Sequence, residues 1–259
     1  MPLIDTNGTK INVEVSGPEN APVLMLSNSL GTNLHMWDDQ AAAWSKHFRV
    51  VRYDRRGHGK SAAPKGPYSF DMLGRDVLGI LDALKIKTIN WCGLSMGGMV
   101  GQWLGANAPD RVNKLVLSNT SSHYTDKTPW NDRIKQVEEK GLGSLVEGNM
   151  QRWFTEGFRT RAPDTIAKMK NIFVTTSVDG YLGCCAAIRD MDFRASNPKI
   201  KAPTLVIVGA QDPATPPAAG EAIQKAIPGA KLASLDAAHI ANMEKPADYT
   251  KTVADFLKG

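Results

Sequence analysis

Three residues of the types that together cleave acyl bonds occur in this chain in the order serine, acid, histidine. Ser95 is the central residue of Gly-Leu-Ser-Met-Gly at 93–97, between an apolar run and a segment with a helical pattern. Asp212 directly follows an expected strand, and His239 alone among the five histidines follows the last expected strand. A serine hydroxyl becomes a strong nucleophile only when a base takes its proton and a third group orients that base. The spacing therefore predicts a catalytic triad of Ser95, His239 and Asp212.

The setting of the serine also predicts a fold. A G-x-S-x-G turn between a strand and a helix is typical of the nucleophile elbow of α/β hydrolases, in which the acid and then the histidine follow the serine. Two competing residues fit the acid's role less well. Asp236 lies too close to His239 along the chain to reach round the imidazole, and Asn119 has no charge to offer it.

An acyl-transfer site of this kind also needs two backbone N–H groups that bind the oxyanion. One is expected from Met96, the residue after the nucleophile, and the other from Leu30 in the loop 28–31 after an early strand. Each donor can stabilise the transition state by about 3 kcal/mol. His58, which lies between two glycines, is disfavoured as a second base, because such loop residues more often serve as scaffolding.

Apolar runs that alternate with helical patterns must position these residues. The expected strands are apolar at nearly every position instead of alternating with polar residues. They therefore predict a mostly parallel central sheet with helices on both faces. An Asn-Gly turn at residues 7 and 8 predicts a hairpin over 3–15. Further strands are expected at 22–27, 48–53, 88–92, 112–118, 202–209 and 230–235, and helices at 40–45, 70–84, 99–107, 218–227 and 246–257.

The alternation stops at about Thr120. From there to Asn197 no convincing core strand is found, but helical stretches occur at 132–139, 142–153, 164–177 and 180–188. The chain is therefore expected to be an α/β-hydrolase fold with an inserted helical cap. Its core would comprise residues 1–120 and 198–259, and its cap residues 121–197.

Composition excludes several other classes of protein. Hydrophobic residues make up 42% and charged residues 22% of the 259 residues, as in ordinary globular proteins. The net charge of +5 comes from scattered lysines and arginines rather than from a basic run. This pattern does not predict nucleic-acid binding, but it is compatible with a small anionic substrate.

The cysteines and the apolar runs indicate the compartment. The three cysteines, two of them adjacent, form no disulfide framework, which favours a reducing environment. No secretory signal and no run of membrane-spanning length is found, so a cytoplasmic protein with no membrane association is expected. No spacing of histidines and cysteines suggests a metal, and no cofactor is expected.

Several longer segments resemble one family within the α/β-hydrolase superfamily, the 3-oxoadipate enol-lactonases. The most specific are Cys-Cys-Ala-Ala-Ile-Arg-Asp at 184–190 and Gln-Trp-Leu-Gly at 102–105. The resemblance implies that the protein opens the enol-lactone of 3-oxoadipate to 3-oxoadipate through an acyl-enzyme, in the β-ketoadipate pathway of bacterial aromatic catabolism. The similar segments are 28–32, 53–61, 93–105, 183–192 and 212–216.

That substrate carries a carboxylate at a distance from the reacting carbonyl. A cation of the cap is expected to bind it, and Arg133, Arg189 and Arg194 are the candidates, with Trp130 or Trp153 as an apolar wall. Exposed arginines are common, so the sequence leaves the choice among the three open.

Two other functions stay open. A carboxylesterase or a perhydrolase that acts on small esters would use the same triad. A ligand receptor of the same fold would keep the triad but turn over slowly, and nothing in the cap indicates an exposed partner surface. A haloalkane dehalogenase is disfavoured, because the nucleophile position holds serine rather than aspartate.

Overall fold

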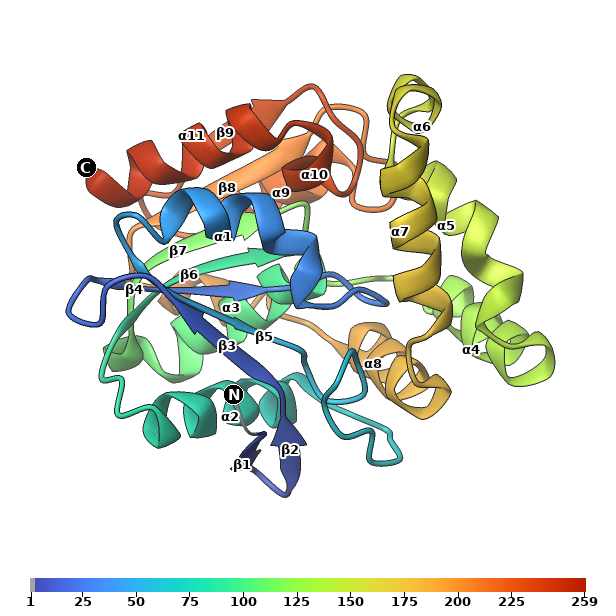
Figure 1. Ribbon diagram of the computed structural model, residues 1–259, viewed down its shortest axis with the longest axis horizontal. Helices are drawn as coiled ribbons and strands as arrows, with labels where there is room; N and C mark the ends of the chain where they lie inside the picture. Colours follow the sequence, from blue (N-terminus) through green and yellow to red (C-terminus); the bar gives the residue numbers. More distant parts are fainter. Residues whose placement is uncertain (1–2) are drawn as a thin grey trace.

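A twisted seven-stranded sheet runs through the computed structural model, which describes residues 3–259 (Figure 1). Residues 1 and 2, which the predicted core of residues 1–120 includes, lie outside the described residues. The order of the strands is β3-β5-β4-β6-β7-β8-β9, and only β3 is antiparallel to its neighbour. The strands are β3 (Val13–Ser16), β4 (Val23–Ser27), β5 (Arg49–Tyr53), β6 (Ile89–Leu94), β7 (Val112–Ser118), β8 (Thr204–Gly209) and β9 (Lys231–Leu235).

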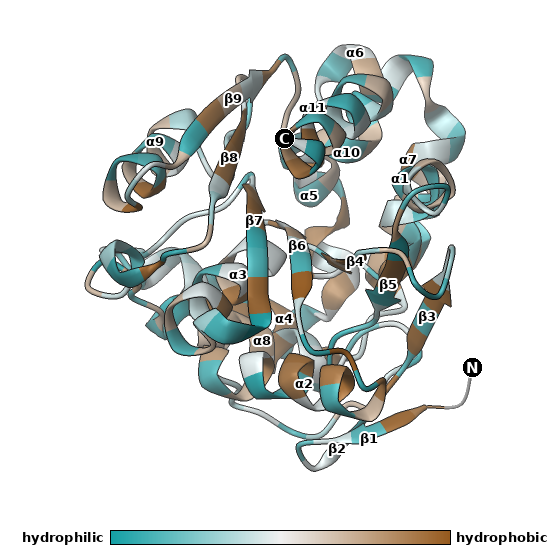
Figure 2. Ribbon diagram, turned by 90° about the vertical axis from the view of Figure 1, so that its left-hand side faces the viewer, coloured by the Kyte–Doolittle hydropathy of each residue, from teal (hydrophilic) through white to brown (hydrophobic). Residues whose placement is uncertain are grey.

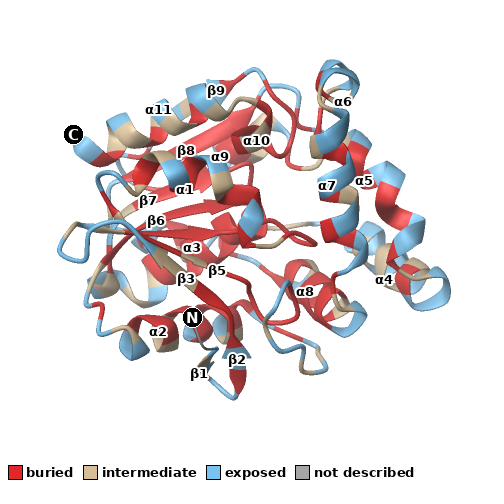
Figure 3. Ribbon diagram, viewed as in Figure 1, coloured by how far each residue is buried: buried red, intermediate tan, exposed pale blue. Residues whose placement is uncertain are grey.

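Helices cover both faces of this sheet, which confirms the predicted α/β class. On one face α1 packs against α11, and on the other α3 lies against β6 and β7 with α2 beside it. Strands β6 and β8 are buried along their whole lengths, whereas the helices expose their outer faces (Figure 3). The helices that cover the two faces of the sheet are α1 (Asp38–Trp44), α2 (Phe70–Ala83), α3 (Met96–Asn107), α9 (Pro217–Ala226), α10 (Ala241–Glu244) and α11 (Pro246–Lys258).

The burial follows the hydropathy of the residues. Hydrophobic residues gather on the strands, and hydrophilic residues occupy the outward surfaces of helices such as α9 and α11 (Figure 2). The long apolar runs were therefore a sound guide to the buried parallel strands. Among the helices of residues 3–259, none combines the length and the apolar character that crossing a bilayer requires.

The predicted N-terminal hairpin is confirmed only for its first part. Strands β1 (Ile4–Thr6) and β2 (Thr9–Ile11) pair with each other, but β3 joins the main sheet beside β5. The break falls at Asn12, whose backbone N–H donates to Ser61 Oγ and whose side chain donates to Asp54 Oδ2 over 2.9 Å. These distant partners satisfy Asn12 and redirect the chain, so the alternating pattern could not reveal the break.

Five helices lie between β7 and β8, at the carboxyl end of the sheet (Figure 1). Helix α4 packs on α8 and α5 on α7, with Trp153 and Tyr181 meeting Phe173 edge-on at 5.7 and 5.5 Å between ring centroids. A short helix between the second and third predicted helices was not expected. The helices are α4 (Thr128–Lys140), α5 (Val146–Trp153), α6 (Glu156–Arg161), α7 (Pro163–Val174) and α8 (Val178–Asp190).

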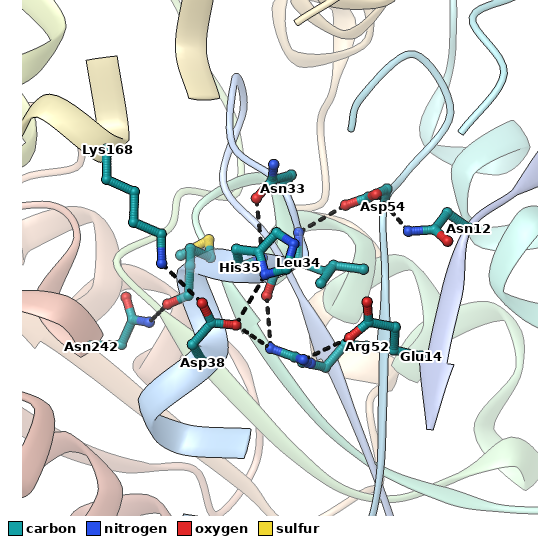
Figure 4. Close-up of polar contacts among 11 residues, drawn as sticks. Asn12, Glu14, Asn33, Leu34, His35, Asp38, Arg52, Asp54, Lys168 and Asn242 are labelled. Carbon is teal, nitrogen blue, oxygen red and sulfur yellow. Dashed lines mark hydrogen bonds and ion pairs between the residues drawn. The ribbon is translucent and has the colours of Figure 1, made fainter. Parts of the chain in front are cut away.

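A charged cluster joins these helices to the sheet domain. Asp38, at the start of α1, accepts from Arg52 Nη1 over 2.7 Å and from Lys168 Nζ of α7 over 2.9 Å (Figure 4). Burial raises the pKa of Asp38, but hydrogen bonds from Lys168, Arg52 and His35 outweigh it and hold this pKa below its usual value. The side chains of Asp38 and Lys168 are each more than 40% exposed, so the pair contributes little free energy and mainly sets orientation.

Candidate active site

Ser95 lies at the apex of a tight turn between β6 and α3. Its backbone angles are φ 57° and ψ −116°, a strained conformation for a residue with a side chain. A Cβ at Gly93 would lie 2.1 Å from Gly97 O, and one at Gly97 would lie 2.1 Å from Ser27 O. The two glycines therefore permit the close approach of strand, turn and helix that the strained serine requires.

Neighbouring strands fix the backbone of this serine. Ser95 N–H donates to Ser118 O over 2.8 Å, and the hydroxyl of Thr120 donates to Ser95 O over 2.7 Å. The Ser95 side chain lines a cavity of about 280 Å³ that His239 also lines. The backbone of this serine is thus held by hydrogen bonds, and the residue borders the cavity.

His239 and Asp212 form a buried pair at the carboxyl ends of β8 and β9. His239 Nδ1 lies 2.8 Å from Asp212 Oδ2, and both residues are 3% exposed. Nε2 of His239 has no hydrogen-bond partner among residues 3–259, and His239 lines the cavity, so this nitrogen can act as a base there. The structure thus brings the three predicted triad residues to one edge of the sheet.

Asp212 is surrounded by donors. Its Oδ1 accepts the backbone N–H groups of Ala214 and Thr215 over 2.8 and 3.0 Å, and its Oδ2 accepts from Thr215 Oγ1 and Asn119 Nδ2 over 2.7 and 3.0 Å. Burial by itself raises the pKa of Asp212, but the charge of His239 and the bonds from His239 and Thr215 lower it to about 2. The carboxylate is therefore ionised throughout the physiological range.

The two residues that compete with Asp212 for the acid's role lie elsewhere. Asn119 donates to Asp212 and to Ala238 O, so it supports the carboxylate rather than replacing it. Asp236 is exposed and accepts from Gln211 Nε2 over 2.7 Å. Neither residue hydrogen-bonds to the imidazole of His239.

Two backbone N–H groups stand free beside the serine. Leu30 lines the cavity, and Met96 is the first residue of α3. Within residues 3–259 neither of these N–H groups has a hydrogen-bond acceptor, although the N–H groups of Ser29 and Gly31 do. Buried amides without a partner are rare, so this arrangement suits an oxygen of a bound ligand.

The outer wall of the cavity comes from α4, α5 and α8 and carries two arginines. Arg133 Nη1 donates to Tyr181 Oη over 2.7 Å, and both Arg133 and Arg152 donate to Asn149 Oδ1, over 3.2 and 2.9 Å. Neither guanidinium forms an ion pair with a carboxylate of the described chain, although the exposed Asp126 also lines the cavity. Burial and the neighbouring Arg133 both lower the pKa of Arg152.

The side chains around Arg133 and Arg152 offer hydrogen-bond donors to an anion. The amide nitrogen of Asn149, which is 2% exposed, has no hydrogen-bond partner among residues 3–259. Burial raises the pKa of Tyr181, so its hydroxyl stays protonated beside Arg133. Two cations and a free amide donor on one wall fit a carboxylate.

The structure brings some of the predicted substrate-binding residues to this cavity and leaves others out. Trp130, Arg133 and Trp153 line it. The prediction for Arg189 needs correction, because Arg189 pairs with Asp190 over 2.7 Å and does not line the cavity. Arg194 likewise pairs with Asp192 over 2.6 Å.

Sequence reasoning missed Arg152 and Asn149. A signal was available, since Asn149 and Trp153 are four residues apart on one predicted helix and so share a face. Arg152, three residues after Asn149, lies on the same face.

The described chain contains no cluster of three or more potential metal ligands among its His, Cys, Asp and Glu residues.

The mostly parallel sheet, the strained serine turn and the buried carboxylate–histidine pair define the class of α/β hydrolases. The family described as "alpha/beta hydrolase fold" matches residues 22–246. "3-oxoadipate enol-lactonase 2" of Acinetobacter baylyi is 40% identical over 96% of this chain and 93% of its own length. "3-oxoadipate enol-lactonase 1" of the same organism is 36% identical over 99% and 96%.

A solved structure agrees with these relatives. The enol-lactonase from Burkholderia xenovorans LB400 superposes with a TM-score of 0.98, at 45% identity and with complete coverage of both chains. The chain belongs to the 3-oxoadipate enol-lactonase family of α/β hydrolases, which confirms the resemblance seen in its sequence.

Proposed function

We propose that this protein hydrolyses the enol-lactone of 3-oxoadipate, 4,5-dihydro-5-oxofuran-2-acetate, to 3-oxoadipate. One observation carries the assignment beyond family membership. The cavity that Ser95 and His239 line is also lined by Arg133 and Arg152, which have no carboxylate partner among the described residues. A lactone that carries a carboxylate away from its carbonyl matches this distribution of groups.

The chemistry begins at the lactone carbonyl. Ser95 Oγ attacks the carbonyl carbon while His239 takes the hydroxyl proton, and Asp212 stabilises the imidazolium. The N–H groups of Leu30 and Met96 bind the oxyanion of the tetrahedral intermediate. When the intermediate collapses, the ring C–O bond breaks and leaves an acyl-enzyme with an enol, which tautomerises to the ketone and so disfavours ring closure.

Hydrolysis of the acyl-enzyme completes the reaction. His239, having passed its proton to the departing enol oxygen, takes a proton from water as the water attacks the acyl carbon. The second tetrahedral intermediate uses the same two N–H groups and releases the carboxylic acid and the Ser95 hydroxyl. The acid ionises, so the product carries two carboxylates.

The substrate carboxylate is expected at Arg133, with Arg152 and Asn149 beside it. Arg133 lies over the ring of Trp130, 5.6 Å from its centroid, and Trp153 completes the apolar wall. The ion contact orients the ring so that its carbonyl faces Ser95.

The proposed division of labour follows the chain. Residues 1–120 and 198–259 form the core that performs the chemistry, and residues 121–197 form the helical cap that selects the substrate. Ten of the cavity's lining residues, among them Tyr124 and Ile188, come from this cap. We place the enzyme in the cytoplasm, which agrees with its three unpaired, buried cysteines.

Removing the Arg133 cation from the cavity wall should affect anionic and neutral substrates differently. We expect Arg133→Met to lower kcat/KM for the enol-lactone by about 10- to 100-fold, as for the loss of a charged hydrogen bond, and to leave p-nitrophenyl acetate hydrolysis almost unchanged. Initial rates on both substrates measure this difference.

Arg189→Met is the matched control, since Arg189 also belongs to these helices but pairs outside the cavity. It should keep native rates on both substrates. An equal loss on the lactone and on the neutral ester in Arg133→Met would count against the anion site. A native preference for neutral esters over the lactone would favour the carboxylesterase function.

A further inference from the structure

The loop that carries the free Leu30 N–H is held from behind by one short segment. This segment, residues 54–59, follows β5 and is called here the bracing segment. It contacts the Leu30 loop, residues 28–34, at three points. The contacts are those of Arg55 to Asn28 O, of Gly31 N–H to His58 Nε2 over 3.0 Å, and of Leu34 N–H to Asp54 Oδ1 over 2.8 Å.

The three contacts surround the amide that the mechanism uses. Arg55 holds the peptide group before Ser29, and His58 holds the peptide group after Leu30. The peptide group between them carries the Leu30 N–H, which is left without an acceptor in the described chain. The Ser29 carbonyl of this same peptide group accepts from Thr32 Oγ1 over 2.9 Å. Because the peptide group is planar, this contact and the two outer contacts together restrain the direction of the Leu30 N–H.

The bracing segment is itself immobilised. The second oxygen of Asp54 accepts from Asn12 Nδ2 over 2.9 Å (Figure 4). It also accepts from Lys60 N–H over 2.9 Å. Asp54, Arg55 and His58 are each at most 2% exposed. None of the three lines the cavity, so none can touch a substrate there.

The contact of His58 requires one particular protonation state. Its Nε2 accepts from Gly31, so its Nδ1 carries the proton and points at Arg56 O, 3.3 Å away. Burial and the nearby charge of Arg55 lower the pKa of His58 to about 3, which keeps the ring neutral and Nε2 an acceptor at working pH. His58 was disfavoured as a second base from its sequence context, and its burial behind the loop agrees with that interpretation.

Arg55 adds a second, unusual feature. Its guanidinium is buried with two of its three nitrogens unpartnered among the described residues, and it forms no ion pair there with a carboxylate. A buried cation of this kind is costly to the fold.

We propose that His58 and Arg55 are positioning residues that hold the Leu30 N–H in the direction of the oxyanion. The inference rests on the proposed acyl-transfer function and adds residues that never contact the substrate. Such restraint matters because displacing a transition-state donor by about 1 Å can cost on the order of 100-fold in rate. The effect should fall on kcat, since the donor binds charge that develops only in the transition state.

The test compares His58→Met, which removes the acceptor, with His58→Gln, whose Oε1 can accept from Gly31 in its place. On p-nitrophenyl acetate, we expect His58→Met to lower kcat by about 10-fold or more with little change in KM. The inhibition constant of phenylboronic acid, which forms a tetrahedral adduct with a serine, should rise by the same factor. His58→Gln should recover most of both quantities.

Two further variants keep the test decisive. Arg55→Met removes a costly buried cation, so it is expected to fold even if His58→Met does not, and it should show the same paired loss. Gln102→Leu removes buried hydrogen bonds of α3 that touch neither segment, so it should lower the melting temperature without changing kcat.

The outcomes separate this proposal from the proposed function. The positioning role would be overturned if a folded His58→Met or Arg55→Met protein kept the native kcat and the native inhibition constant for phenylboronic acid. An equal loss in His58→Gln and His58→Met would also overturn it. The neutral ester makes the result independent of the lactone, and substitution of Ser95 tests the acyl chemistry separately.

Discussion

Replacing Ser95 with alanine is expected to lower kcat for lactone hydrolysis by about 10⁴- to 10⁶-fold, as for other serine nucleophiles. The lost oxygen is the only atom that forms the covalent bond to the acyl group. The alanine protein retains the cavity, the cap arginines and the two free N–H groups, so KM should change little. Single-turnover and steady-state rates on the enol-lactone measure the loss.

The location of the covalent bond can be checked directly. A phosphonate ester that labels active serines should add its mass to the peptide containing Ser95 in the native protein and to no peptide of Ser95→Ala. Ser122→Ala, which alters a buried serine outside the cavity, should be labelled and should turn over like the native protein. A Ser95→Ala protein with near-native kcat would exclude the covalent mechanism.

Asp212→Asn is expected to lower kcat by about 10⁴-fold with the fold intact. Asparagine has nearly the same shape, but it cannot stabilise the imidazolium and its amide group can favour the wrong tautomer of His239. The exposed Asp236 provides the control, since Asp236→Asn should keep native kcat. Similar losses in both variants would show that Asp212 is not the orienting acid.

The Asp212 carboxylate should also change how the free energy of unfolding depends on pH below pH 4. The pKa of Asp212 is lowered to about 2 in the folded protein from an unfolded value near 3.8. The ionised form therefore stabilises the fold above pH 4, and this contribution is lost as the pH falls towards 2. Denaturant titrations should show a smaller loss of unfolding free energy between pH 4 and 2 in Asp212→Asn than in the native protein.

The sequence predicted the core of the site because its signals are local. The turn around Ser95 needs glycines within two residues, and Asp212 and His239 each follow a strand that the sequence predicted, the buried β8 and the more exposed β9. The order of these elements along a parallel sheet brings their ends to one edge. Neither the fold class nor the candidate triad depended on contacts that a sequence hides.

The cap was harder to interpret because tertiary packing decides which face of each helix meets the cavity. Arg189 and Arg133 are equally plausible in sequence, but Arg189 lies beside Asp190, which pairs with it at the surface. Arg152 and Asn149 face inward only because α5 packs on α7. The break at Asn12 likewise depends on partners 42 and 49 residues away.

The strained conformation of Ser95 affects attempts to evolve a more thermostable form of this protein. Glycine adopts a φ of 57° with this ψ easily, whereas other residues bear a cost of about 1–3 kcal/mol there. Selection on thermal tolerance alone would therefore enrich glycine at position 95 and yield robust but inert molecules. Any such campaign has to score turnover together with heat resistance.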